Sequence, residues 1–328
     1  MAQAPPPFLA YPPIVAHGPR FPVIIGPTAG GKSGLAMDLA EQLARAGTLV
    51  EIVSADSIQI YRGLDIGSAK PTPAERERVP HHLIDVVEPE AAYSVHQWLG
   101  AATAAIQDIR TRGRVPVVVG GTHLYVKALL EGLFEGPGAD EGLRAELRAM
   151  EAGSRRAELE RVDPAAAARI HPNDERRTVR ALEVFRLTGR AISEHQGQWD
   201  SGGRAGVGVD AVLVGLEWET EAINRRINER VREMVRRGLV EEARGLWEGA
   251  RFGAQSREAL GYKQLIAHFE GRGTLEDAVE EIKIETRRFA KNQRTWMRRL
   301  RAAGGGVWIE AGLTEPAEWP RVVLGLIR

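Results

Sequence analysis

Eight consecutive residues have the types and spacing of a phosphate-binding loop. The segment Gly26-Pro27-Thr28-Ala29-Gly30-Gly31-Lys32-Ser33 matches the P-loop pattern, with an apolar run before it and a helical pattern after it. Glycines let backbone N–H groups turn toward phosphate oxygens at a helix start, Lys32 supplies positive charge, and the Ser33 hydroxyl can bind Mg²⁺. The sequence therefore predicts a diphosphate site with Mg²⁺. The loop recognises phosphate geometry only, which leaves open whether the diphosphate belongs to a nucleotide.

A carboxylate is expected beside this loop. Asp56 follows the apolar run 49–54, while Gly120, Gly121 and Thr122 follow or end the apolar run 114–121. The carboxyl ends of parallel strands build the ligand site of an α/β sheet, so both segments are expected to face the P-loop. A carboxylate beside bound phosphates is costly unless it binds Mg²⁺ or accepts a hydrogen bond from a substrate donor. Asp56 is therefore a candidate for one of these two roles, with a purely structural role as the alternative.

The elements that must position these residues alternate between strands and helices. Strands are expected at 21–26, 49–54, 82–87, 114–121, 210–218 and 307–310. The alternation predicts an α/β fold, a P-loop doubly wound parallel sheet with helices on both faces. Between residues 136 and 206 no strand is evident and short helices dominate, so a smaller all-helical domain is expected there. The predicted parts are a mobile Pro-rich leader (1–20), a P-loop α/β catalytic domain (21–135 and 207–328) and the helical insertion (136–206).

Long helices are expected at 221–237, 256–270 and 274–302, and the last of them is strongly basic. Between residues 283 and 301 it has a single acid, Glu285, among eight basic residues: Lys283, Arg287, Arg288, Lys291, Arg294, Arg298, Arg299 and Arg301. A solvated helix face usually carries both signs of charge. The pattern thus favours a polyanionic ligand, with an ordinary solvated face as the alternative.

Composition limits the class of protein. The chain has 328 residues, a formal net charge of zero, 43% hydrophobic residues and no cysteine. Disulfides, thiol nucleophiles and cysteine-based zinc sites are thereby excluded. No apolar run approaches the ~18 residues of a membrane-spanning helix. We expect a soluble, cytoplasmic, monomeric protein that does not associate with membranes.

Seven segments together resemble the bacterial tRNA dimethylallyltransferases. They are GPTAGGKS, SADSIQIYRGLDIGSAKP, HHLIDVVEP, VVVGGTHLYVKALLEG, RALEVFRLTG, LGYKQ and TRRFAKNQRTWMRR, in that order between residues 26 and about 299. The resemblance implies transfer of the dimethylallyl group of dimethylallyl diphosphate to N6 of adenosine 37, in tRNAs that read codons beginning with U. Diphosphate is released, Mg²⁺ is the cofactor, and the anticodon stem-loop of tRNA is the macromolecular partner.

The same resemblance implies roles for particular residues. All eight P-loop residues bind the donor diphosphate, and Thr28 also belongs to the catalytic set. Asp56 contacts the N6 amine and acts as general base. The positions that contact tRNA are Asp56, Ser57, Ile58, Gln59, Thr122, Arg144, Arg176, Arg177, Arg180, Glu258, Gly261, Tyr262 and Lys263. The chain departs from its relatives at Arg176, where many have glutamine, and at Gly30, where many have serine.

Two arginines complete the predicted catalytic set. Arg226 and Arg230 lie four residues apart, on one face of the predicted helix 221–237. One of them is expected to clamp the diphosphate, and an exposed ion pair with neighbouring glutamates is the alternative. As far as Gly121, the sequence also resembles a small-molecule kinase, in which the P-loop would hold ATP and Asp56 would activate a hydroxyl. This kinase is the alternative function. The basic helix and the helical insertion favour tRNA over a metabolite.

Overall fold

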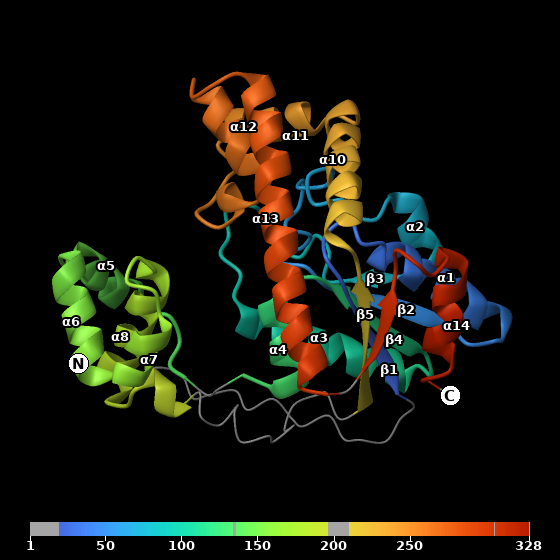
Figure 1. Cartoon of the computed structure of the whole chain (residues 1–328), viewed down its shortest axis with the longest axis horizontal. Helices are drawn as coiled ribbons and strands as arrows, with labels where there is room; N and C mark the ends of the chain where they lie inside the picture. The colour runs from blue at the N-terminus through green and yellow to red at the C-terminus, as the bar shows by residue number, and fades with distance from the viewer. Residues whose placement is uncertain (1–19, 134–135, 196–209, 305, 328) are drawn as a thin grey trace. The chain divides into compact units, whose positions relative to one another are not determined.

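A parallel sheet forms the centre of the computed structural model, which describes residues 20–133, 136–195, 210–304 and 306–327 (Figure 1). Within these ranges the sheet has six strands in the order β3-β2-β4-β1-β5-β6, and every neighbouring pair is parallel. The strands are β1 (Phe21–Ile25), β2 (Val50–Ala55), β3 (His81–His82), β4 (Val115–Gly120), β5 (Ala211–Glu217) and β6 (Val307–Glu310). The predicted α/β fold with a parallel sheet is confirmed.

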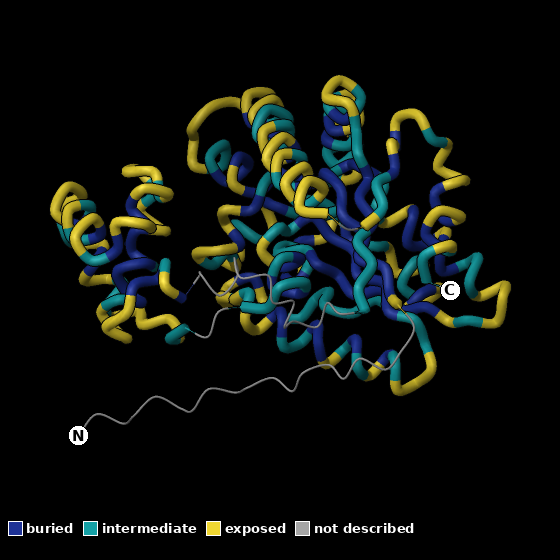
Figure 2. The backbone as a smooth tube through the Cα atoms, turned by 60° about the horizontal axis from the view of Figure 1, so that its bottom comes forward, coloured by how far each residue is buried: buried dark blue, intermediate teal, exposed yellow. Residues whose placement is uncertain are grey.

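Helices cover the sheet because both of its faces are apolar. On one face, α1 (Lys32–Arg45) and α14 (Trp319–Leu324) pack with Ile24 in a common core. Phe21, on the opposite side of β1 by the alternation of strand residues, lies under the guanidinium of Arg110 from α3 (Val95–Thr111). The indole of Trp98, also on α3, donates a hydrogen bond to the Ser54 carbonyl (3.0 Å). After β4 comes α4 (His123–Glu131). β1 and β2 are buried along their whole length, in the dark blue that Figure 2 uses for buried backbone.

A second apolar cluster lies beyond the sheet. It joins α10 (Thr220–Arg236), α11 (Leu239–Glu248), α12 (Tyr262–Phe269) and α13 (Leu275–Ala302) to the loop after β2. Ile60 and Leu64 bring that loop into the cluster, and both are fully buried. None of the described helices combines the length and the apolar character needed to cross a membrane.

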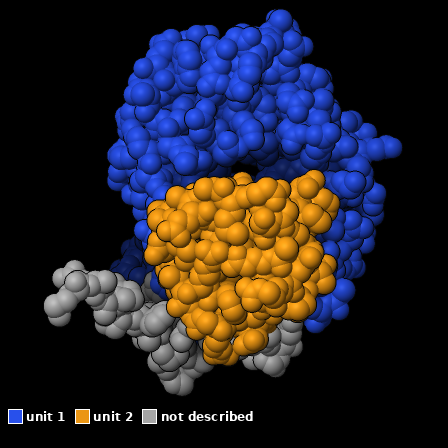
Figure 3. Space-filling model, turned by 90° about the vertical axis from the view of Figure 1, so that its left-hand side faces the viewer, with its two compact units in different colours: residues 1–130, 206–328 blue, residues 131–205 orange. Residues whose placement is uncertain are grey.

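The chain divides into two compact units, residues 1–130 with 206–328 and residues 131–205, which Figure 3 colours separately. In the described part of the smaller unit, α5 (Glu141–Ala149), α6 (Ala152–Val162), α7 (Pro164–Arg169) and α8 (Glu175–Thr188) surround their own apolar core. Asp163 caps α7, and its side chain accepts the N–H of Ala166 (2.8 Å). Except for Arg20, the predicted leader lies outside the described residues.

Two predicted elements are wrong in extent. The predicted helix 256–270 is instead a 3₁₀ turn (Ser256–Glu258) followed by α12, because Gly261 has a left-handed φ of 93° that interrupts the helix. The predicted strand 82–87 is reduced to β3 and an isolated bridge, because Leu83 and Asp85 have positive φ and cannot continue a strand. The sequence analysis did not predict α11, α14 or the short α2 (Pro73–Arg78).

Candidate active site

The P-loop joins β1 to α1 in a tight turn. The N–H of Gly30 donates to the Pro27 carbonyl (3.0 Å), and Gly31 has a φ of 90°, which strains any residue with a side chain. The ammonium of Lys32 donates to the carbonyls of Gly26 (3.0 Å) and Pro27 (2.9 Å). Burial and, to a smaller extent, the nearby charge of Arg230 lower the pKa of Lys32 to about 8, and the charge of Asp56 opposes this shift. The loop thus presents a positive group whose charge depends on what the pocket holds.

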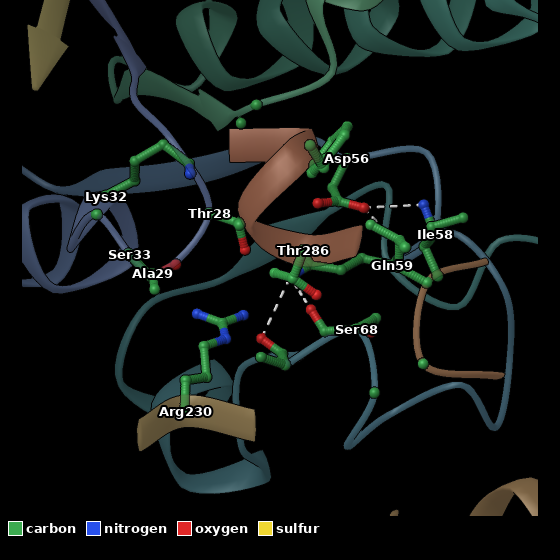
Figure 4. A pocket seen from close by; sticks show the side chains of 18 of the residues that line it. Thr28, Ala29, Lys32, Ser33, Asp56, Ile58, Gln59, Ser68, Arg230 and Thr286 are labelled. Carbon is green, nitrogen blue, oxygen red and sulfur yellow. Dashed lines mark hydrogen bonds between the residues drawn. The ribbon is translucent and has the colours of Figure 1, made fainter. Parts of the chain in front are cut away.

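Arg226 and Arg230 differ in what they contact. Nε of Arg226 donates to the Ala29 carbonyl (2.8 Å), and its guanidinium lies over the Trp218 ring, 4.6 Å from the centroid. Arg230 points into the pocket beside the P-loop, as Figure 4 shows. Burial lowers the pKa of Arg230, and Asp56 acts against this shift. Among the described residues neither arginine forms an ion pair with a glutamate, so the alternative of an exposed ion pair is not observed. Arg226 holds the loop, whereas Arg230 is the one positioned to meet a ligand.

Asp56 follows β2 and faces the same pocket. One carboxylate oxygen, Oδ1, accepts the N–H groups of Ile58 (2.8 Å) and Gln59 (3.3 Å), the first of which is drawn in Figure 4. The other oxygen, Oδ2, has no hydrogen-bond partner in the described part of the chain. Two backbone donors therefore orient the carboxylate and leave one oxygen available to a substrate.

Thr122 connects the ends of β2 and β4. Its N–H donates to the Ala55 carbonyl (3.3 Å), and its hydroxyl oxygen accepts the N–H of Ser57 (3.1 Å). Gln59 is tied down by different partners, since its side chain accepts from the Ser54 hydroxyl (3.0 Å) and donates to two backbone carbonyls. The predicted tRNA-contact residues after Asp56 thus also build the wall of the site.

These residues line one pocket of about 810 Å³. Its walls come from the P-loop, the ends of β2 and β4, the loop 67–69, and the helices α10 and α13. The predicted site residues that line it are Thr28, Ala29, Gly30, Gly31, Lys32, Ser33, Asp56, Ser57, Ile58, Gln59, Thr122, Arg226, Arg230, Glu258 and Gly261. Gly26 and Pro27, the first two residues of the P-loop, do not line the pocket. Their carbonyls accept hydrogen bonds from Lys32.

The sequence analysis missed one residue that lines this site, Gln293, and one that supports it from outside the pocket, Glu242. Gln293 of α13 is 2% exposed and bonds to both the P-loop and the end of β4. Glu242 of α11 accepts three consecutive backbone N–H groups, from Asp65 (3.1 Å), Ile66 (2.8 Å) and Gly67 (3.1 Å). A carboxylate that satisfies several backbone donors fixes the loop that carries them. The sequence feature that could have identified Gln293 and Glu242 is the presence of a polar residue in the apolar stripe of each helix.

The GYKQ segment divides between the pocket and the core. Tyr262 is fully buried, and its hydroxyl donates to Glu242 (2.6 Å). The predicted tRNA contact by this side chain is not supported, because the side chain has no exposed surface. Glu258 and Gly261 reach the pocket, and Lys263 forms an exposed ion pair with Glu258 (2.5 Å).

The predicted tRNA-contact arginines of the smaller unit fall into two groups. Arg144 and Arg180 bind the fully buried carboxylate of Glu183, at 2.9 and 2.6 Å. Both arginines counteract the effect of burial, and they hold the pKa of Glu183 below its usual value. Arg176 and Arg177 are exposed at the start of α8. The first pair orders the unit, and the second pair is accessible to a polyanion.

A Mg²⁺ ion would find oxygen ligands here, but few from the protein. Ser33 lines the pocket with an exposed side chain, and no group of three or more His, Cys, Asp or Glu suited to a metal occurs among the described residues. Mg²⁺ usually keeps several waters and binds substrate phosphates with only one or two protein ligands. A lone hydroxyl beside a phosphate cradle fits that pattern.

Comparison with known proteins gives one family. The model described as IPP transferase matches residues 59–300, and that described as isopentenyl transferase matches residues 19–86. The tRNA dimethylallyltransferase of Geobacillus kaustophilus is 46% identical over 283 residues, 84% of this chain and 86% of the relative. That of Thermotoga neapolitana is 42% identical over 94% of this chain and 98% of its own length.

Solved structures agree with the sequence relatives. The full-length tRNA isopentenylpyrophosphate transferase of Bacillus halodurans has a TM-score of 0.67 and 37% identity, covering 94% of this chain and 96% of the other. A eukaryotic dimethylallyltransferase acting on tRNA has a TM-score of 0.76 and 29% identity, and the match covers 92% of this chain and 76% of the other. With a family model matched over most of its length and relatives at more than 40% identity, this chain belongs to the IPP transferase family.

Proposed function

We propose that this protein transfers the dimethylallyl group from dimethylallyl diphosphate to N6 of adenosine 37, in tRNAs that read codons beginning with U. The observation that supports this most directly is the shared pocket, where a phosphate cradle and the oriented carboxylate of Asp56 lie on the same lining surface. The names of the relatives, which are tRNA dimethylallyltransferases, support the donor and the acceptor.

The two halves of the site suit the two halves of the reaction. N6 of adenine attacks C1 of the prenyl group, the C1–O bond breaks, and its electron pair leaves with the diphosphate. The N6 proton passes to Oδ2 of Asp56, because an amine conjugated with the purine ring is a poor nucleophile that needs a base. Lys32, Arg230 and the P-loop N–H groups stabilise the charge that accumulates on the leaving diphosphate. Bound Mg²⁺, held by Ser33, would neutralise part of the same charge.

An apolar part of the remaining lining favours an allylic donor over a nucleotide. Ile227, Val231 and Met234 of α10, Leu239 of α11 and Ile282 of α13 line the same pocket. Such side chains suit a hydrocarbon group, because they offer no donor or acceptor for a purine edge. The prenyl chain therefore lies against these helices in our proposal.

Exposed positive charge supplies the contact with tRNA. Lys291, Arg298 and Arg299 of α13 are exposed, as are Arg176 and Arg177 of the smaller unit. Phosphate contacts give most of the affinity for RNA, and the target base must leave its stack to reach Asp56.

The test is prenyl transfer without ATP. The protein is incubated with unmodified tRNA, dimethylallyl diphosphate and Mg²⁺, and the nucleosides are then analysed by mass. We expect N6-dimethylallyl adenosine at position 37 and release of one diphosphate per transfer. If adenosine stays unmodified, while ATP supports phosphorylation of a small metabolite, the kinase function replaces this proposal.

A further inference from the structure

Gln293 joins two separate parts of the pocket. Its Oε1 accepts the N–H of Thr28 (2.8 Å), and its Nε2 donates to the carbonyl of Gly121 (3.0 Å). We propose that Gln293 is a positioning residue that fixes the diphosphate cradle relative to the catalytic carboxylate. This inference rests on the proposed function for its kinetic consequences.

The surroundings of Gln293 are shaped for its amide. Only 2% of its surface is exposed, so an unmet donor or acceptor here would be costly. A Cβ added to Gly121 would lie 2.3 Å from Nε2 of Gln293 and 3.3 Å from the Gly26 carbonyl. The glutamine amide therefore occupies the space that a side chain at position 121 would fill.

A path made of hydrogen bonds and two peptide links runs from this amide to the carboxylate. Gly121 precedes Thr122, whose hydroxyl oxygen accepts the N–H of Ser57, the residue after Asp56. Thr28 lies at the other end of the path, in the P-loop that binds the diphosphate. Gln293 is the member that closes the connection between the leaving group and the base.

The bond to Thr28 also removes one donor from the cradle. The Thr28 N–H is directed to Gln293, so phosphate binding is left to the other N–H groups of the loop and to Lys32. Loss of Gln293 would leave each binding surface intact but let their relative positions vary. Catalysis is more sensitive to such a displacement than binding is, and a shift near 1 Å can cost about a hundredfold in rate.

The first variant is Gln293→Met, which keeps the size of the side chain and removes both hydrogen bonds. We expect kcat to fall roughly ten- to a hundredfold. The dissociation constants of Mg²⁺–dimethylallyl diphosphate and of the anticodon stem-loop should each change less than about threefold, since neither surface is altered. A wild-type kcat would overturn the inference, as would a loss of activity and binding in equal measure.

The second variant is Gln293→Glu, which adds a pH-dependent readout when each kcat is normalised to the folded fraction measured by circular dichroism at that pH. An ionised glutamate can accept from Thr28 but has no proton for the Gly121 carbonyl, whereas a protonated one supplies both bonds. The ratio of its kcat to that of wild type should therefore rise as the pH falls from 8.5 to 6. A flat ratio would overturn the inference, even if Gln293→Met failed to fold.

The control is Asn292→Ala, on the neighbouring exposed residue of α13, which should match wild type. Hydrogen exchange in the P-loop peptide and in the peptide around Gly121 separates this inference from the proposed function. Both peptides should exchange faster in Gln293→Met, whether or not the wild type prenylates tRNA. Unchanged exchange in both would overturn the positioning role, and an inactive wild type would overturn only the proposed function.

Discussion

Lys32 should take up a proton when the donor binds. Its pKa in the free protein is about 8, against an ordinary value of 10.5. A bound diphosphate favours the charged ammonium and returns the pKa toward that ordinary value. The difference between these two pKa values corresponds to about 3 kcal/mol, which is the most that the charged Lys32 can add to the binding free energy through this shift. The contribution of Lys32 to donor affinity is therefore nearly complete well below pH 8 and declines as the pH rises through 8.

The size of the effect follows from the fraction of neutral lysine. At pH 7 about a tenth of the free sites are neutral, so binding should take up ~0.1 proton; at pH 9 about nine tenths are neutral, and uptake should be ~0.9. The dissociation constant of dimethylallyl diphosphate should rise about tenfold from pH 7 to pH 9. Phosphate esters lose their second proton near pH 6, so the ligand is about nine tenths ionised at pH 7 and fully ionised at pH 9. The uptake at pH 9 therefore reports Lys32 without a contribution from the ligand.

Calorimetry with Mg²⁺, without tRNA and in two buffers of different ionisation enthalpy, measures this uptake directly. Lys32→Met should bind weakly with no proton uptake at any pH. Arg230→Met should move the midpoint to higher pH, because Arg230 is one cause of the lowered pKa. No proton uptake by wild type at pH 9, with a flat dissociation constant, would refute the reasoning.

Three further outcomes are expected. Asp56→Asn should lower kcat by ~10²–10⁴ in the prenyl-transfer assay, with donor and tRNA binding within about tenfold, because it removes the base and keeps the shape. Neutralising the exposed cations of α13 should weaken tRNA binding and reduce the slope of log K against log salt by about 0.7–0.9 for each phosphate that the protein no longer neutralises. The cations to neutralise are Lys291, Arg298 and Arg299, which are exposed and, unlike the exposed Arg288 and Arg301, form no ion pair with a described residue. Glu242→Gln should lower the free energy of unfolding by about 2 kcal/mol in urea titrations, because backbone donors of the loop 65–67 lose a charged acceptor.

Each of these has a result that contradicts it. Near-normal turnover of Asp56→Asn would remove the carboxylate from the mechanism. An unchanged salt slope would mean that the basic face of α13 does not meet phosphates. For Glu242, the matched control is Glu241→Gln, an exposed neighbour on α11. Equal stability of the two variants would show that the loop does not depend on the half-buried carboxylate of Glu242.

The sequence alone determined the elements that are local in the chain. The P-loop is eight consecutive residues between a strand and a helix, so its position required no knowledge of packing. The alternation of strands and helices determined the parallel sheet, because the run lengths and the apolar pattern are themselves local. Asp56 was placed at the pocket by a rule of topology, namely that parallel strands present their carboxyl ends at one edge.

Only the tertiary structure decided which side chains complete the site. Gln293 bonds to a residue 265 positions away, and no spacing in the sequence indicates that contact. Arg226 and Arg230 look equivalent on a helical pattern, yet the fold sets one on the Ala29 carbonyl and leaves the other facing the pocket. Left-handed backbone at Gly261 broke a helix that apolar periodicity had joined. These outcomes depend on which backbone groups need partners after the chain has packed, and that is a property of the assembled fold.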